Sequence, residues 1–372
     1  MKIKGSEFDE VELQSEPVET GQILWNKLPN TPRRADFSYG EKVSVRVPRR
    51  ININILDMTK LVPSGQKCTI CDAGSISFGV NLYSSLELKL TESSEIVIYD
   101  EKNERILSHR LCIFRELTDY RGGFEVWAEP NPYVHVGLGS TGSLTFALSL
   151  AANEALRNPF TERELVKLHA NNYVELNPRN NILVPGQSTG ASGWVALRGG
   201  LCVTSSLNEL VFREVMPEGY KVIVGIPPLE EIIGGQSGKG VAESDVEMPF
   251  LGKLRHYDRF NSAKMCYWTL MELMPAAVDR NMRRFGDVIW DMVLTGSKGV
   301  PTILAHGTYK PLDCLLDIRK TGAEATFVSS VGPSVITIAS NGYEGKVKET
   351  YEKHGCEVLE LEFDNKGKII KR

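Results

Sequence analysis

The sequence lacks the features of a membrane protein, a disulfide scaffold or a nucleic-acid-binding protein. No stretch approaches the run of about 18 apolar residues that a membrane span needs, and the polar, acidic N-terminus holds no signal-peptide core. The seven cysteines are an odd, scattered set that suits a reducing compartment. With 43 Lys and Arg against 47 Asp and Glu, the formal net charge is −4, without the basic excess of a duplex-binding protein. We therefore expect a cytoplasmic protein with no nucleic-acid or membrane partner.

Zinc-ligand patterns are also scarce. Cys68 and Cys71 form one C-x-x-C pair, but no second pair of ligands follows at a similar spacing. A structural zinc site needs four ligands, so we interpret this pair as structural or incidental.

The length and the order of patterned segments predict a two-domain α+β protein. At roughly 150 residues per domain, 372 residues favour two cores. Alternating or β-branched segments predict strands at 42–56, 76–90, 95–99, 201–203, 220–226, 325–329, 334–339 and 356–363, and a strand, turn and strand over 124–136. Apolar periodicity predicts helices at 144–156, 161–174 and 346–354, and two more within 261–294. We expect an N-terminal extension (1–45), an N-terminal domain (46–226) and a C-terminal domain (227–372).

A glycine-rich loop lies between a predicted strand and a predicted helix. Its residues are Gly137, Leu138, Gly139, Ser140, Thr141, Gly142 and Ser143. Such a loop directs backbone N–H groups and the positive end of a helix at an anion, which suits phosphate, although a tight packing turn has the same sequence. The spacing is neither that of a Walker A loop nor that of a dinucleotide fingerprint.

The loop and the helix after it resemble the first signature of the GHMP kinase superfamily, in which this loop holds a nucleotide's phosphates. A segment at 322–334, which contains Ser330, resembles a second signature in the same chain order. The resemblance implies a two-domain GHMP-kinase-like α+β fold. Superfamily kinases that use a catalytic base carry an Asp after a Ser-Gly pair. Here the matching region offers Ser192, or Trp194 and Val195, and no carboxylate.

A different branch of the superfamily, the β-ribofuranosylaminobenzene 5′-phosphate synthases, resembles the chain over about residues 45 to 340. The motifs that carry this resemblance are Arg50-Ile51-Asn52 with Asp57, Asp72-Ala73-Gly74, His135 through Ser140, Gly186 through Gly200, Leu270 through Ala276, and Ser329 through Pro333. The family usually has His where this chain has Asn52, and this difference concerns the acceptor more than the reaction.

The resemblance implies a decarboxylating phosphoribosyltransferase. Phosphoribosyl pyrophosphate would react with 4-aminobenzoate, 4-hydroxybenzoate or a related aromatic carboxylic acid to form a C-riboside, with release of CO2 and pyrophosphate. We expect Mg²⁺ as cofactor and a homodimer. The alternatives are an ATP-dependent small-molecule kinase and a catalytically silent binding module.

The expected site residues fall into three groups. Asp57 and Asp72 are candidate ligands of the metal or of the ribose hydroxyls, with Ser140 as a further metal ligand, although either Asp also suits a turn. Arg50 and Arg198 are candidates for the 5′-phosphate or the acceptor carboxylate, or for surface ion pairs. The remaining candidates are His135 as a catalytic contact, and Gly137 through Ser143, Thr189, Gly190, Ser192, Lys239 as a lid cation, and Ser330 for substrate binding.

Overall fold

The computed structural model describes most of the chain. The described residues are 17–24, 32–60, 73–130, 132–177, 180–228, 244–297, 311–330 and 332–372. Cys68, Cys71, Asp72 and Lys239 lie outside them. The described part is a mixed α+β protein, as the sequence predicts, with two sheets and two main hydrophobic cores. None of its helices combines the length and hydrophobicity needed to span a bilayer.

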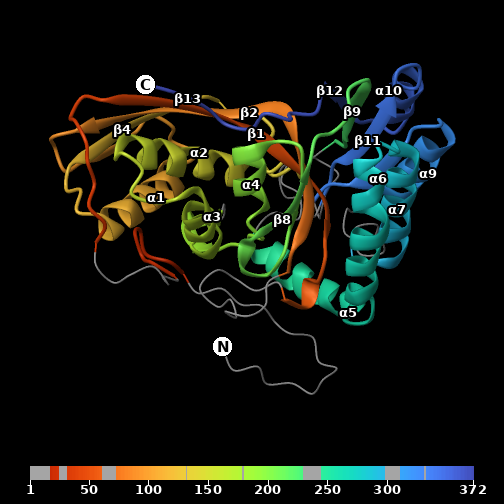
Figure 1. The fold of residues 1–372 in the computed structure, drawn as a ribbon, viewed down its shortest axis with the longest axis horizontal. Helices are drawn as coiled ribbons and strands as arrows, with labels where there is room; N and C mark the ends of the chain where they lie inside the picture. Colours follow the sequence, from red (N-terminus) through yellow and green to blue (C-terminus); the bar gives the residue numbers. More distant parts are fainter. Residues whose placement is uncertain are drawn as a thin grey trace.

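The larger sheet has seven strands and dominates one half of the molecule (Figure 1). Its strands are β1 (Lys42–Ile55), β2 (Ser75–Thr91), β3 (Ile96–Ile98), β4 (Gly123–Ala128), β7 (Leu201–Thr204), β8 (Leu210–Glu214) and β13 (Ile369–Lys371). The main path runs β13-β1-β2-β4-β3, and β7 pairs with both β2 and β8. All pairs are antiparallel except β3 with β4.

A register shift between β1 and β2 precedes Arg50. Pro48 pairs with Tyr83 and Arg49 with Val80, so two residues of β2 between them have no partner in β1. Before the shift, Val45 and Val47 are buried in the core formed with the helices; after it, Ile51 joins the other core. Such an irregularity bends and twists the strand pair locally. Beyond it, Arg50 lies on the side of the helices, where its Nε donates to Oγ of Ser192.

Helices α1 to α4 cover one face of the larger sheet (Figure 1). Their bounds are α1 (Glu104–Leu117), α2 (Ser140–Ala155), α3 (Glu162–Asn171) and α4 (Ala191–Arg198), and the hairpin of β5 (Val174–Asn177) and β6 (Ile182–Pro185) follows α3. The start of α3 confirms the predicted capping box. The Thr161 hydroxyl accepts from the Glu164 backbone N–H, and the Glu164 carboxylate accepts from the Thr161 N–H.

The second sheet has four strands in the order β10-β11-β9-β12, with helices packed on it. Its strands are β9 (Tyr220–Ile226), β10 (Ala325–Val328), β11 (Val335–Ser340) and β12 (Glu357–Leu361), and the nearby helices are α5 (Ser244–Trp268), α6 (Met274–Val278), α7 (Met282–Thr295), α9 (Pro311–Lys320) and α10 (Glu344–Lys353). The sequence places the domain boundary at residue 226. In the structure β9, which ends there, already belongs to the second sheet, and β13 near the C-terminus pairs with β1 of the larger sheet.

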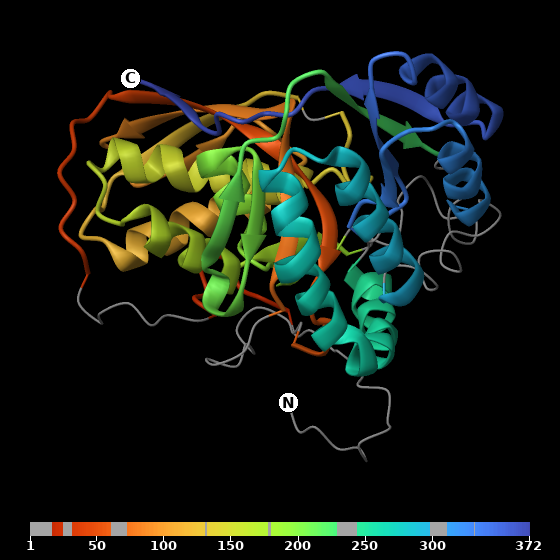
Figure 2. The same cartoon turned by 45° about the vertical axis from the view of Figure 1, so that its right-hand side comes forward.

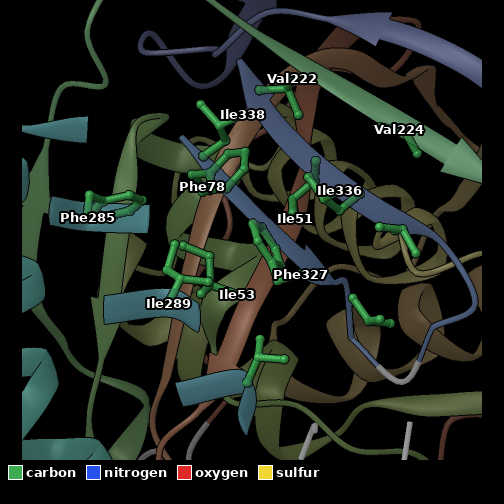
Figure 3. Packing of buried hydrophobic residues seen from close by; sticks show 14 of the residues in the cluster. Ile51, Ile53, Phe78, Val222, Val224, Phe285, Ile289, Phe327, Ile336 and Ile338 are labelled. Atoms are coloured by element: carbon green, nitrogen blue, oxygen red, sulfur yellow. The ribbon is translucent and has the colours of Figure 1, made fainter. Parts of the chain in front are cut away.

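A shared core joins the two sheets. Figure 3 shows Ile51 and Phe78 of the larger sheet among side chains of the second sheet and α7. The Phe78 and Phe327 rings meet edge to face with their centroids 6.4 Å apart. The two halves therefore bury apolar surface against each other.

Helices α5 and α6 form one continuous rod through a π-helical segment at Thr269–Leu273. Pro275 follows this segment, and proline has no N–H for the helical hydrogen bond. The wider π turn accommodates the missing donor. The sequence predicts a kink or a first turn at Pro275, and the structure places it in the first turn of α6, after this bulge.

Several elements differ from the sequence predictions. The second strand expected within 124–136 is wrong, because residues 132–139 form an irregular loop. The stretch 186–200 contains α4, which was not predicted because its five glycines disfavour a helix. Helices α1 and α9 and the strands β5, β6, β8 and β13 were not predicted either.

Candidate active site

One pocket gathers the glycine-rich loop, β1 and the starts of two helices. Its lining residues are Arg50, Asn52, Ile55, His135, Gly137, Gly139, Ser140, Thr141, Gly142, His169, Tyr173, Glu175, Gln187, Ser188, Thr189, Ala191, Ser192, Ser330 and Gly332. These residues come from segments far apart in the chain. Ten of them are sequence-predicted site residues: Arg50, His135, Gly137, Gly139, Ser140, Thr141, Gly142, Thr189, Ser192 and Ser330.

The glycine-rich loop leads directly into α2. Gly139 caps the helix with a left-handed φ of 63°, and a β-carbon there would lie 2.7 Å from Cγ of Arg50. Only glycine fits both the backbone conformation and the close approach. The hydroxyls of Ser329 and Ser143 donate to the carbonyls of Gly137 and Gly139, at 2.6 and 2.9 Å. These bonds fix the backbone of the loop, and Ser143 supports the loop from within α2. Leu138 is buried in the core.

A second helix starts at the same pocket. Gly190 caps α4 with a left-handed φ of 78°. Nε of Arg50 donates to Oγ of Ser192 at 2.9 Å, and a β-carbon on Gly142 would lie 2.7 Å from that same oxygen. The N-termini of α2 and α4 thus meet at Arg50. Their orphan N–H groups, their positive dipole ends and a guanidinium form an electropositive floor.

Two lining residues have a backbone conformation that L-residues rarely adopt. His135 has φ of 60° and Ser330 has φ of 54°. Such strain persists only where the surroundings impose it, and it concentrates at functional sites. Both residues line the pocket together with the glycine-rich turn.

The pocket's wall from α3 and β5 was missed by sequence reasoning. It consists of His169, Tyr173 and Glu175. The Tyr173 hydroxyl donates to Oε1 of Glu175 at 2.9 Å, and the His169 and Tyr173 rings lie 5.7 Å apart. Glu175 is the one carboxylate among the described lining residues. No motif marks it, because the Val174–Asn177 strand has an ordinary sequence.

A buried arginine lies behind this wall. Arg110 of α1 is 2% exposed, and its Nη2 donates to the carbonyl of Asn172 at 3.0 Å, just past the end of α3. A cation at a helix C-terminus meets the negative end of the dipole. Burial lowers the pKa of Arg110 to about 10, so the group stays charged at neutral pH. Arg110 therefore fixes the end of the helix that carries His169.

Asn52 stands where the family pattern has histidine. Its buried Nδ2 lies near three acceptors: the carbonyls of Asn54 and Ile76 at 3.2 and 3.3 Å, and Oγ of Ser77 at 3.2 Å. This short amide lies deep in the pocket floor, held by its own sheet.

No family model matches the chain, but known proteins of similar sequence are found. The chain is 22% identical over 354 residues to a β-ribofuranosylphenol 5′-phosphate synthase of Archaeoglobus fulgidus, covering 87% of this chain and 97% of the relative. It is 24% identical over 310 residues to a protein of the same name from Methanothermobacter thermautotrophicus, covering 79% and 88%. A shikimate kinase of Methanobrevibacter smithii is 23% identical over 320 residues, covering 83% and 98%.

Solved structures give the fold. A homoserine kinase from Cytophaga hutchinsonii superposes with a TM-score of 0.62 at 15% identity, covering 90% of this chain and 98% of that one. Mevalonate diphosphate decarboxylase from Staphylococcus aureus gives 0.60 at 14%, covering 89% and 98%. The chain has the GHMP-kinase fold. The resemblance to the ribofuranosyl 5′-phosphate synthase branch of this superfamily is confirmed.

Within the GHMP-kinase fold, some expected site residues lie outside the pocket. Asp57 does not line it; its Oδ1 accepts from the backbone N–H of Thr59 at 2.9 Å, the turn role that the sequence left open. Arg198 lies at the far end of α4, where it pairs with Glu162 on the surface. Gly190 caps α4 without being a lining residue. Asp72 and Lys239 lie outside the described residues.

The described residues contain no group of three His, Cys, Asp or Glu side chains that could hold a metal. The pocket nevertheless offers oxygen ligands of the kind that Mg²⁺ prefers: the Glu175 carboxylate and the hydroxyls of Ser140 and Thr141. Mg²⁺ commonly binds through one or two carboxylates together with waters and substrate phosphates, so this donor set fits the ion.

Proposed function

We propose that the protein is a decarboxylating phosphoribosyltransferase. It joins the ribosyl carbon of phosphoribosyl pyrophosphate to the ring carbon of 4-hydroxybenzoate, 4-aminobenzoate or a related aromatic acid, and it releases CO2 and pyrophosphate. Two relatives named β-ribofuranosylphenol 5′-phosphate synthase, each aligned over most of the chain, support this reaction.

The meeting of two helix N-termini at Arg50 is the observation that carries the proposal. Phosphoribosyl pyrophosphate is anionic at both ends, with a phosphate on one and a pyrophosphate on the other. The loop at Gly137–Gly142 and the start of α2 suit the pyrophosphate. The start of α4 and the Arg50 guanidinium suit the second anionic group, which is the 5′-phosphate or the acceptor carboxylate.

Glu175, Ser140 and Thr141 would hold Mg²⁺ in this scheme. The ion would neutralise charge on the departing pyrophosphate. The Tyr173 hydroxyl donates a hydrogen bond to the Glu175 carboxylate and so fixes its orientation. The N–H groups of the loop and Arg50 stabilise the same developing charge without reorganising, which is how fixed donors accelerate a reaction.

The chemistry needs no covalent nucleophile. The bond from the anomeric carbon to the pyrophosphate oxygen breaks, and the sugar becomes oxocarbenium-like. The ring carbon that bears the carboxylate then bonds to the anomeric carbon, and loss of CO2 returns an electron pair to the ring. The pocket must hold donor and acceptor in line and exclude water. The absence of a kinase-type Asp at Ser192 is no handicap for this reaction.

The direct test uses the purified full chain with Mg²⁺, phosphoribosyl pyrophosphate and a panel of carboxyl-labelled aromatic acids. We expect labelled CO2 and pyrophosphate to appear together with one or more hydroxy- or aminobenzoates. Pyrophosphate without CO2 would contradict C–C bond formation.

A small-molecule kinase is the second candidate. The similarity to a shikimate kinase and a carboxylate, Glu175, in the pocket both favour it. Incubation with ATP and a panel of small alcohols separates the two functions. Production of ADP that depends on an added alcohol, without turnover of phosphoribosyl pyrophosphate, would establish the kinase.

A further inference from the structure

The wall that carries Tyr173 and Glu175 is built on a small hairpin. Strands β5 and β6 form a two-stranded sheet of their own, apart from the two larger sheets. A hairpin of two strands is at best marginally stable in water, so it depends on the elements that pack against it. Glu175 is the one carboxylate among the described lining residues of the pocket. Its position therefore depends on whatever supports this hairpin.

Successive residues of the hairpin's first strand face opposite sides. Tyr173 and Glu175 line the pocket, whereas Val174 and Leu176 pack in a small hydrophobic cluster outside it. This alternation is the normal geometry of a strand. The other members of the cluster come from β6, from α1 and from a segment near the N-terminus. The hairpin thus presents one face to the pocket and rests on this cluster with the other.

The N-terminal part of the cluster is the segment 17–24, here called the strap. Val18 is 6% exposed, and its N–H donates to the carbonyl of Leu183 at 2.8 Å, so the strap pairs with β6. Leu24 packs against the same cluster. Figure 2 shows the strap as a short red segment on the helix-covered side of the larger sheet. The strap does not itself line the pocket.

Two further hydrogen bonds attach the strap to the elements around the wall. The N–H of Leu24 donates to Oδ1 of Asn172 at 2.7 Å, and the N–H of Gly21 donates to Nδ1 of His109 at 3.0 Å. Asn172 is fully buried and immediately precedes Tyr173 in the chain. The strap therefore holds both the residue before the wall and the strand that pairs with it.

We propose that the strap is a positioning element of the pocket, which holds the strand that presents Tyr173 and Glu175. The role of Glu175 in this inference rests on the proposed function, in which its carboxylate would hold Mg²⁺. A group that orients a metal ligand changes the affinity for the metal without touching it. The N-terminal extension, for which the sequence suggests no function, thereby becomes part of the site.

Hydrogen exchange of the full chain, followed by mass spectrometry, tests the contact. Val18→Asp places a carboxylate in the small cluster and should release the strap. Peptides of β5 and β6 should then exchange at least about 10-fold faster, while those of α2 and α7 stay unchanged and show that the variant folds. Val18→Ala should give a smaller change in the same peptides. Thr20→Asp is the matched control, because Thr20 is exposed in the same strap. Equal protection of the hairpin in the wild-type protein and in Val18→Asp would overturn the proposal.

Calorimetric titration with magnesium pyrophosphate tests whether the strap acts through the carboxylate. We expect Val18→Asp and Glu175→Gln each to weaken binding by about 10-fold, and Thr20→Asp to leave it unchanged. In the double variant the change at Val18 should add nothing, because its effect passes through Glu175. Additive losses would overturn the proposal, as would an unchanged affinity in Val18→Asp. Failure of the wild-type protein to bind magnesium pyrophosphate would contradict the proposed function instead, and hydrogen exchange would still decide the role of the strap.

Discussion

Arg50 is the residue on which the candidate site depends. It follows the register shift between Pro48 and Arg49 of β1, and it bonds to Ser192 at the start of α4 while packing beside Gly139 at the start of α2. One guanidinium therefore ties the starts of two helices together. Its planar, permanently charged head suits phosphate better than a lysine would.

Replacement of Arg50 should impair use of the anionic substrate while sparing the fold. We expect Arg50→Gln to lower kcat/KM for phosphoribosyl pyrophosphate by about 10- to 100-fold, the loss of one or two hydrogen bonds to a charged group. Arg198→Gln is the matched control, since its ion pair with Glu162 lies on the surface outside the pocket. Steady-state kinetics on both variants measure the difference. Equal losses would remove Arg50 from substrate binding.

His109, which does not line the pocket, gives the protein a pH-dependent stability. It is fully buried, and its Nδ1 accepts the N–H of Gly21 at 3.0 Å. Burial, together with the neighbouring Arg110, lowers the pKa of His109 to about 4. The unfolded chain, with a histidine pKa near 6.5, binds the proton more readily between those two values. This contribution to stability is complete above about pH 6.5 and is lost as the pH falls toward 4.

The expected loss between pH 6.5 and 4 is on the order of 3 kcal/mol of unfolding free energy. Urea denaturation of the wild-type protein and of His109→Gln at several pH values measures it. The variant should show a flatter dependence over this window. Parallel curves for the two proteins would show that His109 does not titrate as described.

At the scale of the element, the loop that leads from His135 into α2 depends on glycine conformation. Gly139→Ala combines a left-handed φ of 63° with a contact at 2.7 Å to Arg50. Gly219→Ala is a suitable control, because Gly219 also has a positive φ, 86°, but nothing lies within 4 Å of the added carbon.

Both alanine variants should lose about 1 kcal/mol or more of stability through backbone strain. Only Gly139→Ala should also lose activity, because it displaces Arg50 and the glycine-rich turn of the pocket. Thermal unfolding and turnover, measured together, separate the two effects. Full activity in Gly139→Ala would mean that the close approach of the loop to β1 is not required.

The elements that the sequence predicts well are those with a strong local signal. The alternation of β1, the capping box of α3 and the loop before α2 depend on neighbouring residues, and each lies where expected. Helix α4 escapes because glycine lowers helix propensity, while its cap and packing supply the stability. Local pattern is a weak guide wherever tertiary contacts decide the conformation.

The wall of the pocket could not be predicted for a related reason. His169, Tyr173 and Glu175 carry no motif, and they meet the loop only because α3 packs on α2. Asp57, by contrast, matches an acidic position of the resembling family, but in the structure its carboxylate accepts from the backbone N–H of Thr59 in a local turn. Sequence pattern identified the glycine-rich loop of the pocket, and folding determined which carboxylate shares that pocket.

At the scale of the whole molecule, one shared hydrophobic core joins the two sheets. The larger sheet and its helices carry the pocket, and β13 ties the C-terminus back to β1.

The central claim is that the pocket joins a phosphoribosyl group to an aromatic acid by a C–C bond. The most direct measurement is the amount of CO2 and of pyrophosphate formed in the same reaction of the wild-type protein with phosphoribosyl pyrophosphate, Mg²⁺ and carboxyl-labelled 4-hydroxybenzoate or 4-aminobenzoate. We predict equal amounts of the two products with at least one acceptor, and a parallel fall of both in Arg50→Gln. Retention of the label in the aromatic acid while pyrophosphate accumulates would contradict the account.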